Sequence, residues 1–204
     1  MARHIVFLFS VLVCISSCGP SRTAYQREVR AYQRGAITED TSFVYQLPYP
    51  PQLKPRVVQG YFSRFSHKRR AALDFKLKPG SPVLAARDGI VVRIKADGKR
   101  GGWNKKYRAD GNHVIIQHRD STRTGYWHLR YQSIHVNVGD SVRAGQQIGL
   151  SGKTGYALFP HLHFLAWRWY RGNWQSIGTR FATSKGIRYL RVGKRYRSPS
   201  HAIQ

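Results

Sequence analysis

Short runs of valine, isoleucine and aromatic residues alternate with glycine, proline, aspartate and asparagine from residue 56 onward. Runs of this length and spacing are typical of the strands of an antiparallel sheet. We therefore predict an all-β domain built on an antiparallel sheet. The runs lie at residues 56–62, 72–76, 82–86, 89–96, 112–118, 124–129, 134–138, 146–151 and 162–169.

The segments on either side of these runs predict the domain organisation. Residues 1–17 have the pattern of a signal peptide, and residues 18–55 are polar and then rich in proline, which favours an irregular tether. We place the folded domain at residues 56–180. No aspartate or glutamate follows Asp140, so we expect residues 181–204 to form a basic C-terminal extension.

The N-terminal apolar run, residues 5–15, is too short to span a bilayer but matches the core of a signal peptide. Ile15-Ser16-Ser17 then leads into Cys18, which resembles a bacterial lipoprotein signal in which the cysteine is acylated and becomes the new N-terminus. The alternative is an ordinary signal peptide cut near Ser17. We expect an exported protein of the cell envelope, lipid-anchored at the periplasmic or extracellular face of a membrane.

The charge of the chain indicates an anionic partner. It has 35 Lys and Arg against 9 Asp and Glu, a formal net charge of +26, while 41% hydrophobic and 13% aromatic residues are enough for a packed core. A surface this basic attracts polyanions such as nucleic acid, anionic membranes and acidic wall polymers. Export argues against nucleic acid, so we expect the charge to hold the protein on cell-wall polymer or a membrane surface.

Several common chemistries are excluded by single residues. A phosphate-binding loop would need glycine where Gln147 stands, and the Gly-x-Ser-x-Gly motif of serine hydrolases is broken by Lys153. The only glutamates, Glu28 and Glu39, lie in the expected tether. A glycosidase needs two carboxylates that face each other across the bond, and nothing in the placement of the aspartates favours such a pair.

The histidines are the strongest remaining candidates. On a strand, alternate side chains share a face. His161 and His163 therefore point to the same side, and the same rule places Asp74 on the face opposite its apolar neighbours. It also places His128 opposite Trp127. These polar side chains would then line one groove on a rigid sheet.

Imidazole and carboxylate groups suit zinc, and a catalytic zinc site keeps three protein ligands and a fourth position for water. Any one of these histidines taken alone is better explained as a hydrogen-bonding surface residue. A His-x-His pair, an aspartate and two further histidines, His67 and His128, within one β domain indicate a zinc site instead. Tyr126 belongs either to the groove or to the packing. We assign no role to His113, His118, His135 or His201.

Six segments in continuous order carry a resemblance to a known family. They are His67 with Asp74-Phe75, residues 79–89 (PGSPVLAARDG), His128-Leu129, residues 138–146 (VGDSVRAGQ), residues 151–155 (SGKTG) and residues 160–164 (PHLHF). Over about residues 60–170 the chain resembles the lysostaphin/LytM-type zinc metalloendopeptidases of the M23 family. The resemblance implies an antiparallel β core with a substrate groove and hydrolysis of peptide cross-links in bacterial peptidoglycan.

By position, the resemblance also implies roles for individual residues. His67, Asp74 and His163 take the places of the ligands to one zinc ion. His128 and His161 take the places beside the zinc-bound water, and either of them can serve as the base.

The chain departs from the family at one point. The common spacing is His-x-x-x-Asp, whereas six residues separate His67 from Asp74 here, so we expect Lys68, Arg69 and Arg70 to bulge out as a loop. The competing function is a catalytically silent peptidoglycan-binding lipoprotein, or an activator of other wall hydrolases. The chain keeps every candidate ligand, which favours the active enzyme.

Overall fold

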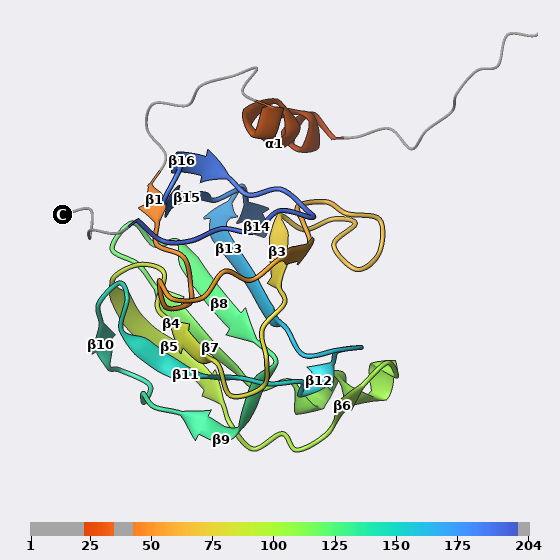
Figure 1. The fold of residues 1–204 in the computed structure, drawn as a ribbon, viewed down its shortest axis with the longest axis vertical. Helices are drawn as coiled ribbons and strands as arrows, with labels where there is room; N and C mark the ends of the chain where they lie inside the picture. Colours follow the sequence, from red (N-terminus) through yellow and green to blue (C-terminus); the bar gives the residue numbers. More distant parts are fainter. Residues whose placement is uncertain (1–22, 35–42, 200–204) are drawn as a thin grey trace, which may run out of the picture.

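The computed structural model describes residues 23–34 and 43–199 (Figure 1). The predicted signal peptide, the predicted lipidation site Cys18 and His201 lie outside these residues. Within the described part of the chain, no helix is long and apolar enough to cross a membrane.

The centre of the fold is an eight-stranded sheet in which every pair of neighbouring strands is antiparallel, as the sequence predicted. The strand order is β10-β5-β7-β8-β13-β3-β2, and β14 continues the sheet beside the far end of β13. These strands are β2 (Val57–Gln59), β3 (Ala72–Phe75), β5 (Gly89–Lys95), β7 (His113–Gln117), β8 (Arg123–Trp127), β10 (Ser141–Val142), β13 (Leu162–Tyr170) and β14 (Asn173–Ile177).

Smaller sheets flank the central one (Figure 1). One has the order β4-β11-β9, and a second joins β6 to β12 in parallel. A third joins β1 to β15 in parallel and β15 to β16 antiparallel. The elements are β1 (Val44–Tyr45), β4 (Pro82–Leu84), β6 (Gly101–Gly102), the 3-10 helix η1 (Lys105–Asp110), β9 (Leu129–Ile134), β11 (Gln147–Ser151), β12 (Gly155–Tyr156), β15 (Arg180–Thr183) and β16 (Gly186–Tyr189).

The helix α1 (Ala24–Arg34) lies next to β16 (Figure 1). Its N-terminus is a capping box: the Thr23 hydroxyl accepts a hydrogen bond from Gln26 N, and the Gln26 side chain accepts one from Thr23 N. Val29 is buried, and it lies close to Gly178. Part of the expected tether is therefore helical and packed.

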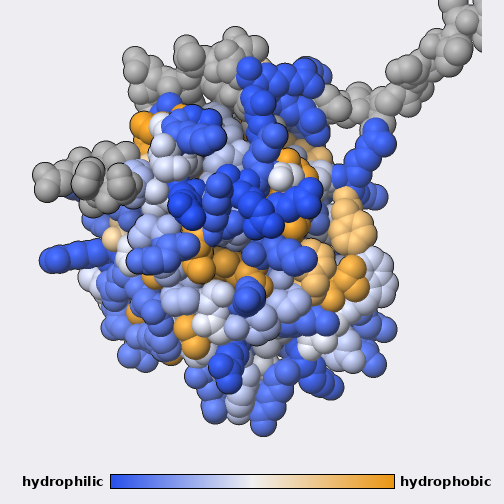
Figure 2. Space-filling model, viewed as in Figure 1, coloured by the Kyte–Doolittle hydropathy of each residue, from blue (hydrophilic) through white to orange (hydrophobic). Residues whose placement is uncertain are grey.

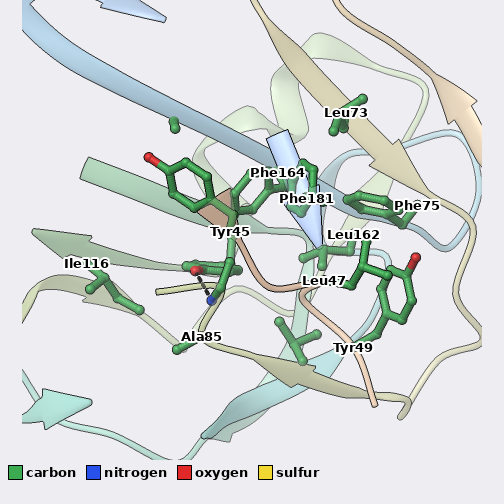
Figure 3. Close-up of a cluster of buried hydrophobic side chains, with 14 of the residues drawn as sticks. Tyr45, Leu47, Tyr49, Leu73, Phe75, Ala85, Ile116, Leu162, Phe164 and Phe181 are labelled. Carbon is green, nitrogen blue, oxygen red and sulfur yellow. Dashed lines mark hydrogen bonds between the residues drawn. The ribbon is translucent and has the colours of Figure 1, made fainter. Parts of the chain in front are cut away.

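The packed unit extends beyond the expected limits of 56 and 180. Tyr45 and Tyr49 from the expected tether, and Phe181 from the expected extension, are buried in the core. Tyr45 contacts Phe181 (ring centroids 6.1 Å), and Tyr49 contacts Phe75 (5.3 Å). The expectations of an irregular tether to residue 55 and an extension from residue 181 are wrong here, because β1 and β15 pair with each other and supply apolar side chains to the core. Figure 3 shows this cluster, including Tyr45, Leu47, Tyr49, Leu73, Phe75, Leu162, Phe164 and Phe181.

Among the described aspartate, glutamate, lysine and arginine residues, only Asp74 and Arg87 are buried. Hydrophilic side chains cover most of the face viewed in Figure 2, with hydrophobic side chains showing between them.

The core takes one face of the central sheet, so the polar residues at alternate positions of β3 and β13 lie on the other face. We call this second face, which carries Asp74 and His163, the site face.

Candidate metal centre

Asp74 and His163 are direct neighbours on the site face. They are register partners across β3 and β13, and His163 Nδ1 lies 2.8 Å from Asp74 Oδ1. Leu73 and Phe75, on either side of Asp74, are fully buried in the core, as alternation predicted. Two hydrogen-bonded strands thus fix the two polar side chains relative to each other.

His67 joins this pair from the loop between β2 and β3. Its Nε2 lies 3.3 Å from Asp74 Oδ1 and 3.1 Å from His163 Nδ1. One ligand atom from each of these three residues lies within 4.8 Å of the other two. We call His67, Asp74 and His163 the metal cluster.

The extra residues after His67 do not displace it from the metal cluster. Lys68, Arg69 and Arg70 are exposed, and Arg70 N donates to His67 O (3.0 Å) across a turn. His67 itself is 1% exposed, and its Nδ1 lies 3.1 Å from Gly60 O. The insertion therefore projects outward while the imidazole remains in place.

The surroundings of the metal cluster favour a charged carboxylate on Asp74 and a neutral imidazole on His163. Burial opposes ionisation of Asp74, but hydrogen bonds and attraction from His163 and His67 outweigh it and hold the pKa of that carboxyl well below its usual range. Burial is the main cause that lowers the pKa of His163, against the opposing attraction of Asp74. At neutral pH the cluster thus offers an anionic oxygen on Asp74 and an unprotonated nitrogen ligand on His163.

The donor set and its surroundings fit a zinc ion. A backbone carbonyl can only accept a hydrogen bond, so the contact with Gly60 O places the proton of His67 on Nδ1 and leaves the lone pair on Nε2, toward the cluster. Metal-binding histidines generally donate their second N–H in this way. Two imidazoles and one carboxylate match a catalytic zinc site with an open position.

His128 and His161 lie beside the metal cluster. Their ring centroids are 4.6 Å apart, and His161 Nε2 lies 3.8 Å from Asp74 Oδ2. His128 Nδ1 donates to Thr154 O (2.7 Å), and His161 Nδ1 donates to Phe159 O (2.8 Å). Both rings consequently keep the lone pair on Nε2.

The environment keeps His128 neutral. Burial, followed by the neighbouring imidazoles of His161 and His163, lowers the pKa of His128 to about 3. A neutral ring with Nδ1 already protonated can accept a hydrogen bond or a proton at Nε2.

The strand alternation predicted at His128 is wrong. His128 has a φ of +66°, a left-handed conformation that ends the alternation of β8. Trp127 therefore lies on the same side as His128: it is the register partner of His163, and the two rings are 5.6 Å apart. Tyr126 belongs to the packing, because it is fully buried and its hydroxyl accepts a hydrogen bond from Ala86 N (2.8 Å).

Thr154 and Asn112 support His128, and the sequence did not single them out for this role. The Thr154 hydroxyl donates to Leu129 O (2.7 Å) and accepts from Asn112 N (3.0 Å). The Asn112 side chain bonds to both backbone polar groups of Gly98. The contact between Thr154 and His128 is made by the backbone carbonyl of Thr154, so no side-chain motif in the sequence predicts it.

The other described histidines lie outside the metal cluster. His113 is the register partner of Trp127 and contacts its ring (5.9 Å), with Nδ1 donating to Gly111 O. His118 is buried with both ring nitrogens hydrogen-bonded, and His135 bonds to Gln147 near the surface.

Three aromatic side chains, two from loops and one from β12, form a row next to His67 and His128. Phe65, two residues before His67, is 62% exposed and contacts Trp103 (ring centroids 5.5 Å), which in turn contacts Tyr156 (6.1 Å). Tyr156 follows Gly155, whose backbone lies beside the His128 ring. Large apolar surfaces are thus available to a ligand next to the histidines.

Comparison with known proteins places the chain in a family. The profile of Peptidase family M23 matches residues 68–176, more than half of the chain, beginning one residue after His67. The chain is 38% identical over 122 residues to the peptidoglycan DD-endopeptidase ShyA of Vibrio cholerae, which covers 57% of this chain and 26% of that protein. It is also 38% identical over 92 residues to the glycyl-glycine endopeptidase ALE-1 of Staphylococcus capitis, with 45% and 23% covered.

The chain was also compared with solved structures. The catalytic domain of lysostaphin from Staphylococcus simulans matches with 31% identity and a TM-score of 0.44, over 61% of this chain and 87% of that one. The chain spans about a quarter of the length of the curated relatives named above. The match over residues 68–176 shows that this chain belongs to peptidase family M23.

Proposed function

We propose that this protein is a zinc-dependent endopeptidase that hydrolyses peptide cross-links of bacterial peptidoglycan. The observation that carries the proposal is the metal cluster, in which two imidazoles and a carboxylate converge, with His128 and His161 beside it. Relatives named for peptidoglycan DD-endopeptidase and glycyl-glycine endopeptidase activity support the reaction and the substrate class.

In this proposal His67, Asp74 and His163 hold the metal. A zinc ion at such a site acts as a Lewis acid toward the scissile carbonyl and provides a nucleophile at neutral pH. The neutral nitrogen ligands and the single carboxylate leave much of the positive charge of the ion uncompensated, which favours both effects.

In this proposal His128 and His161 accept and donate the proton that moves during hydrolysis. Each donates from Nδ1 to a backbone carbonyl, which fixes its orientation and leaves Nε2 to accept a proton or to hydrogen-bond the reacting groups. Once protonated, either imidazole can stabilise a developing oxyanion or pass the proton to the leaving amine. We assign the two histidines to this work together, without dividing it between them.

The silent wall-binding alternative predicts the same binding partner but no turnover. It would require a defect in the metal cluster or in the two adjacent histidines. All five side chains are present, and they lie close together. The active enzyme is therefore the better-supported proposal.

The location of the protein forms part of the proposal. We propose that residues 1–17 direct export and that Cys18 carries a lipid, both from the sequence pattern alone. The net charge of +26 would hold the enzyme on anionic wall polymer or the membrane surface. A Cys18→Ala variant that still takes up labelled fatty acid in cells would disprove lipidation at this residue.

The decisive experiment is a hydrolysis assay with matched variants. The recombinant chain should begin at residue 19 and not near residue 50, because Tyr45, Leu47 and Tyr49 are core residues. Zinc-loaded protein is incubated with peptidoglycan, and new free amines are measured for wild type, His163→Ala and chelator-treated protein. His135→Ala is the control, because His135 lies outside the metal cluster.

We expect wild type and His135→Ala to release new free amines, and His163→Ala and chelator-treated protein to release none. Undiminished activity in His163→Ala would disprove the metal mechanism. Binding without new amines by metal-loaded wild type would favour the silent alternative.

A further inference from the structure

A row of tryptophans leads away from the metal cluster along the site face. In β13, Trp167 and Trp169 share a face with His163, because alternate residues of a strand point to the same side. Trp174 in β14 is the register partner of Trp169, so it lies on that face as well. We call Trp127, Trp167, Trp169 and Trp174 the tryptophan strip.

The rings of the strip follow one another without a gap. The centroids of Trp127 and Trp167 are 5.9 Å apart, those of Trp167 and Trp174 are 6.4 Å apart, and those of Trp174 and Trp169 are 5.2 Å apart. Trp127 also contacts the ring of His163 (5.6 Å). The strip is therefore continuous with the metal cluster.

The ring of Trp127 is seated on Gly125. A Cβ atom built at Gly125 would lie 2.2 Å from two ring carbons of Trp127 and 3.0 Å from Trp167. Glycine at this position lets the indole lie flat on β8 and reach Trp167. The sequence thus provides room for an aromatic surface along the sheet.

The outer part of the strip is open to solvent. Trp169 is 58% exposed and Trp174 is 47% exposed. Indole rings at this exposure leave apolar area that a ligand can cover, and a contiguous patch of such area marks a binding surface. The Arg123 guanidinium lies over Trp174, 4.6 Å from the ring centroid, and adds hydrogen-bond donors at the edge of the strip.

We propose that the tryptophan strip binds the sugar strand that carries the peptide to be cut. This inference rests on the proposed function and adds a second part of the same substrate to the peptide. Pyranose rings present flat C–H faces that pack on indole rings, while their hydroxyl and amide groups stay in water or meet donors such as Arg123. Trp169 lies six strand positions beyond His163, a distance of roughly 20 Å that several sugar rings can span.

The position of the strip favours a sugar strand over a membrane. The outer pair, Trp169 and Trp174, lies one residue pair before the β13–β14 hairpin turn at Arg171 and Gly172. A membrane anchor would need aromatic rings only at this tip, but the row continues from there along the sheet through Trp167 to Trp127. The contact between Trp127 and His163 also joins the strip to the reacting centre. A ligand that reaches both must carry the scissile peptide and an attached apolar-faced group together.

The first test measures binding by the full chain. The probe is peptide-free glycan strand prepared from peptidoglycan, and the readout is tryptophan fluorescence or calorimetry. Measurements in a His163→Ala background remove any turnover. We expect Trp169→Ala combined with Trp174→Ala to weaken binding by about tenfold or more, as expected for losing two stacking contacts.

Tyr170→Ala is the matched control for this test. Tyr170 is 44% exposed and adjacent to Trp169, but it points to the opposite face of β13. Equal losses in the two variants, or no binding of glycan strand by the wild-type strip, would overturn the proposal. So would glycan binding that the double variant retains while it loses binding to anionic vesicles.

The second test separates this proposal from the proposed function. Hydrolysis is compared for a cross-linked peptide without sugars and for the same peptide attached to glycan. We expect the double variant to lower the preference for the glycan-bearing substrate about tenfold, and Tyr170→Ala to leave it unchanged. An equal fall in the hydrolysis rate on both substrates would overturn the proposal that the tryptophan strip binds sugar. If the wild type cleaves neither substrate, the proposed endopeptidase function is wrong. The binding test still decides whether the tryptophan strip binds a sugar strand.

Discussion

His163 and Asp74 face each other across β13 and β3, with Nδ1 and Oδ1 2.8 Å apart. A pair held by two paired strands is more precisely placed than one held by loops. The third member of the metal cluster, His67, comes from a loop, but its ring is anchored at Gly60 O. The site is therefore built mainly from rigid parts.

The charge of Asp74 is expected to be essential for metal binding. Asp74→Asn keeps the size of the side chain and removes the anion that the neighbouring histidines stabilise. We expect zinc affinity to fall by at least about 100-fold, and hydrolysis with it. Zinc content after dialysis and the hydrolysis rate check this, with Asp97→Asn, an exposed carboxylate paired with Lys95, as the control. Full zinc content in Asp74→Asn would contradict the assignment.

His128 is expected to affect chemistry without affecting metal content. His128→Asn is the informative change, because asparagine tolerates the left-handed backbone that His128 adopts at φ +66°. We expect hydrolysis to fall by about 100-fold or more, the range seen for lost acid–base groups. Zinc content and the unfolding midpoint should stay close to those of wild type. Loss of zinc in this variant would instead make His128 a ligand.

Thr154 is expected to act as a positioning residue for His128. Thr154→Val keeps the shape and removes the hydroxyl that bonds Leu129 O and Asn112 N. We expect a loss of about 1–3 kcal/mol in the free energy of unfolding and a lower kcat with unchanged zinc content. Thr154→Ser restores the hydroxyl and should recover both properties. A purely structural role would lower stability while leaving kcat per folded molecule unchanged.

His118 is expected to make stability depend on pH. It is buried, Nδ1 donates to Asp88 O (2.7 Å), and burial is the main cause that lowers its pKa below 6.5. The unfolded chain binds a proton near pH 6.5 that the folded chain does not. The contribution of neutral His118 to the free energy of unfolding is therefore complete above pH 6.5 and declines as the pH falls below that value.

Urea unfolding at pH 7.5 and pH 5.5 measures this effect. All other titratable groups are the same in both proteins, so the comparison of wild type with His118→Gln isolates His118. We expect the loss of stability between the two pH values to be smaller in His118→Gln by about 1 kcal/mol. An identical loss in both proteins would contradict the prediction.

The net charge of +26 is expected to govern attachment more than chemistry. Salt screens interactions between exposed charges, with a Debye length of about 10 Å at 0.1 M and about 3 Å at 1 M. We expect rising salt to weaken binding to whole cell wall much more than it slows hydrolysis of a small soluble peptide. Sedimentation with wall fragments and a parallel peptide assay measure the two effects. Equal sensitivity in both assays would refute this role for the charge.

The sequence predicted those features that depend on local periodicity. The alternation of polar and apolar residues around Asp74 and His163 predicted the antiparallel sheet and the face on which both side chains lie. The same rule failed at His128, because a single left-handed residue ends the alternation and periodicity carries no signal for it. It also gave no sign that Trp127 would lie beside His163.

The sequence by itself determined which candidate ligand types are present, their order along the chain and the strands that carry two of them. Only the tertiary structure decided which groups meet. His67 reaches His163 across 96 residues, and the carbonyl that orients His128 comes from Thr154, 26 residues away. Tyr49, in a proline-rich stretch that resembles a tether, became core because it packs against Phe75. Such contacts depend on chain closure over long distances, whereas sequence patterns report only on neighbouring residues.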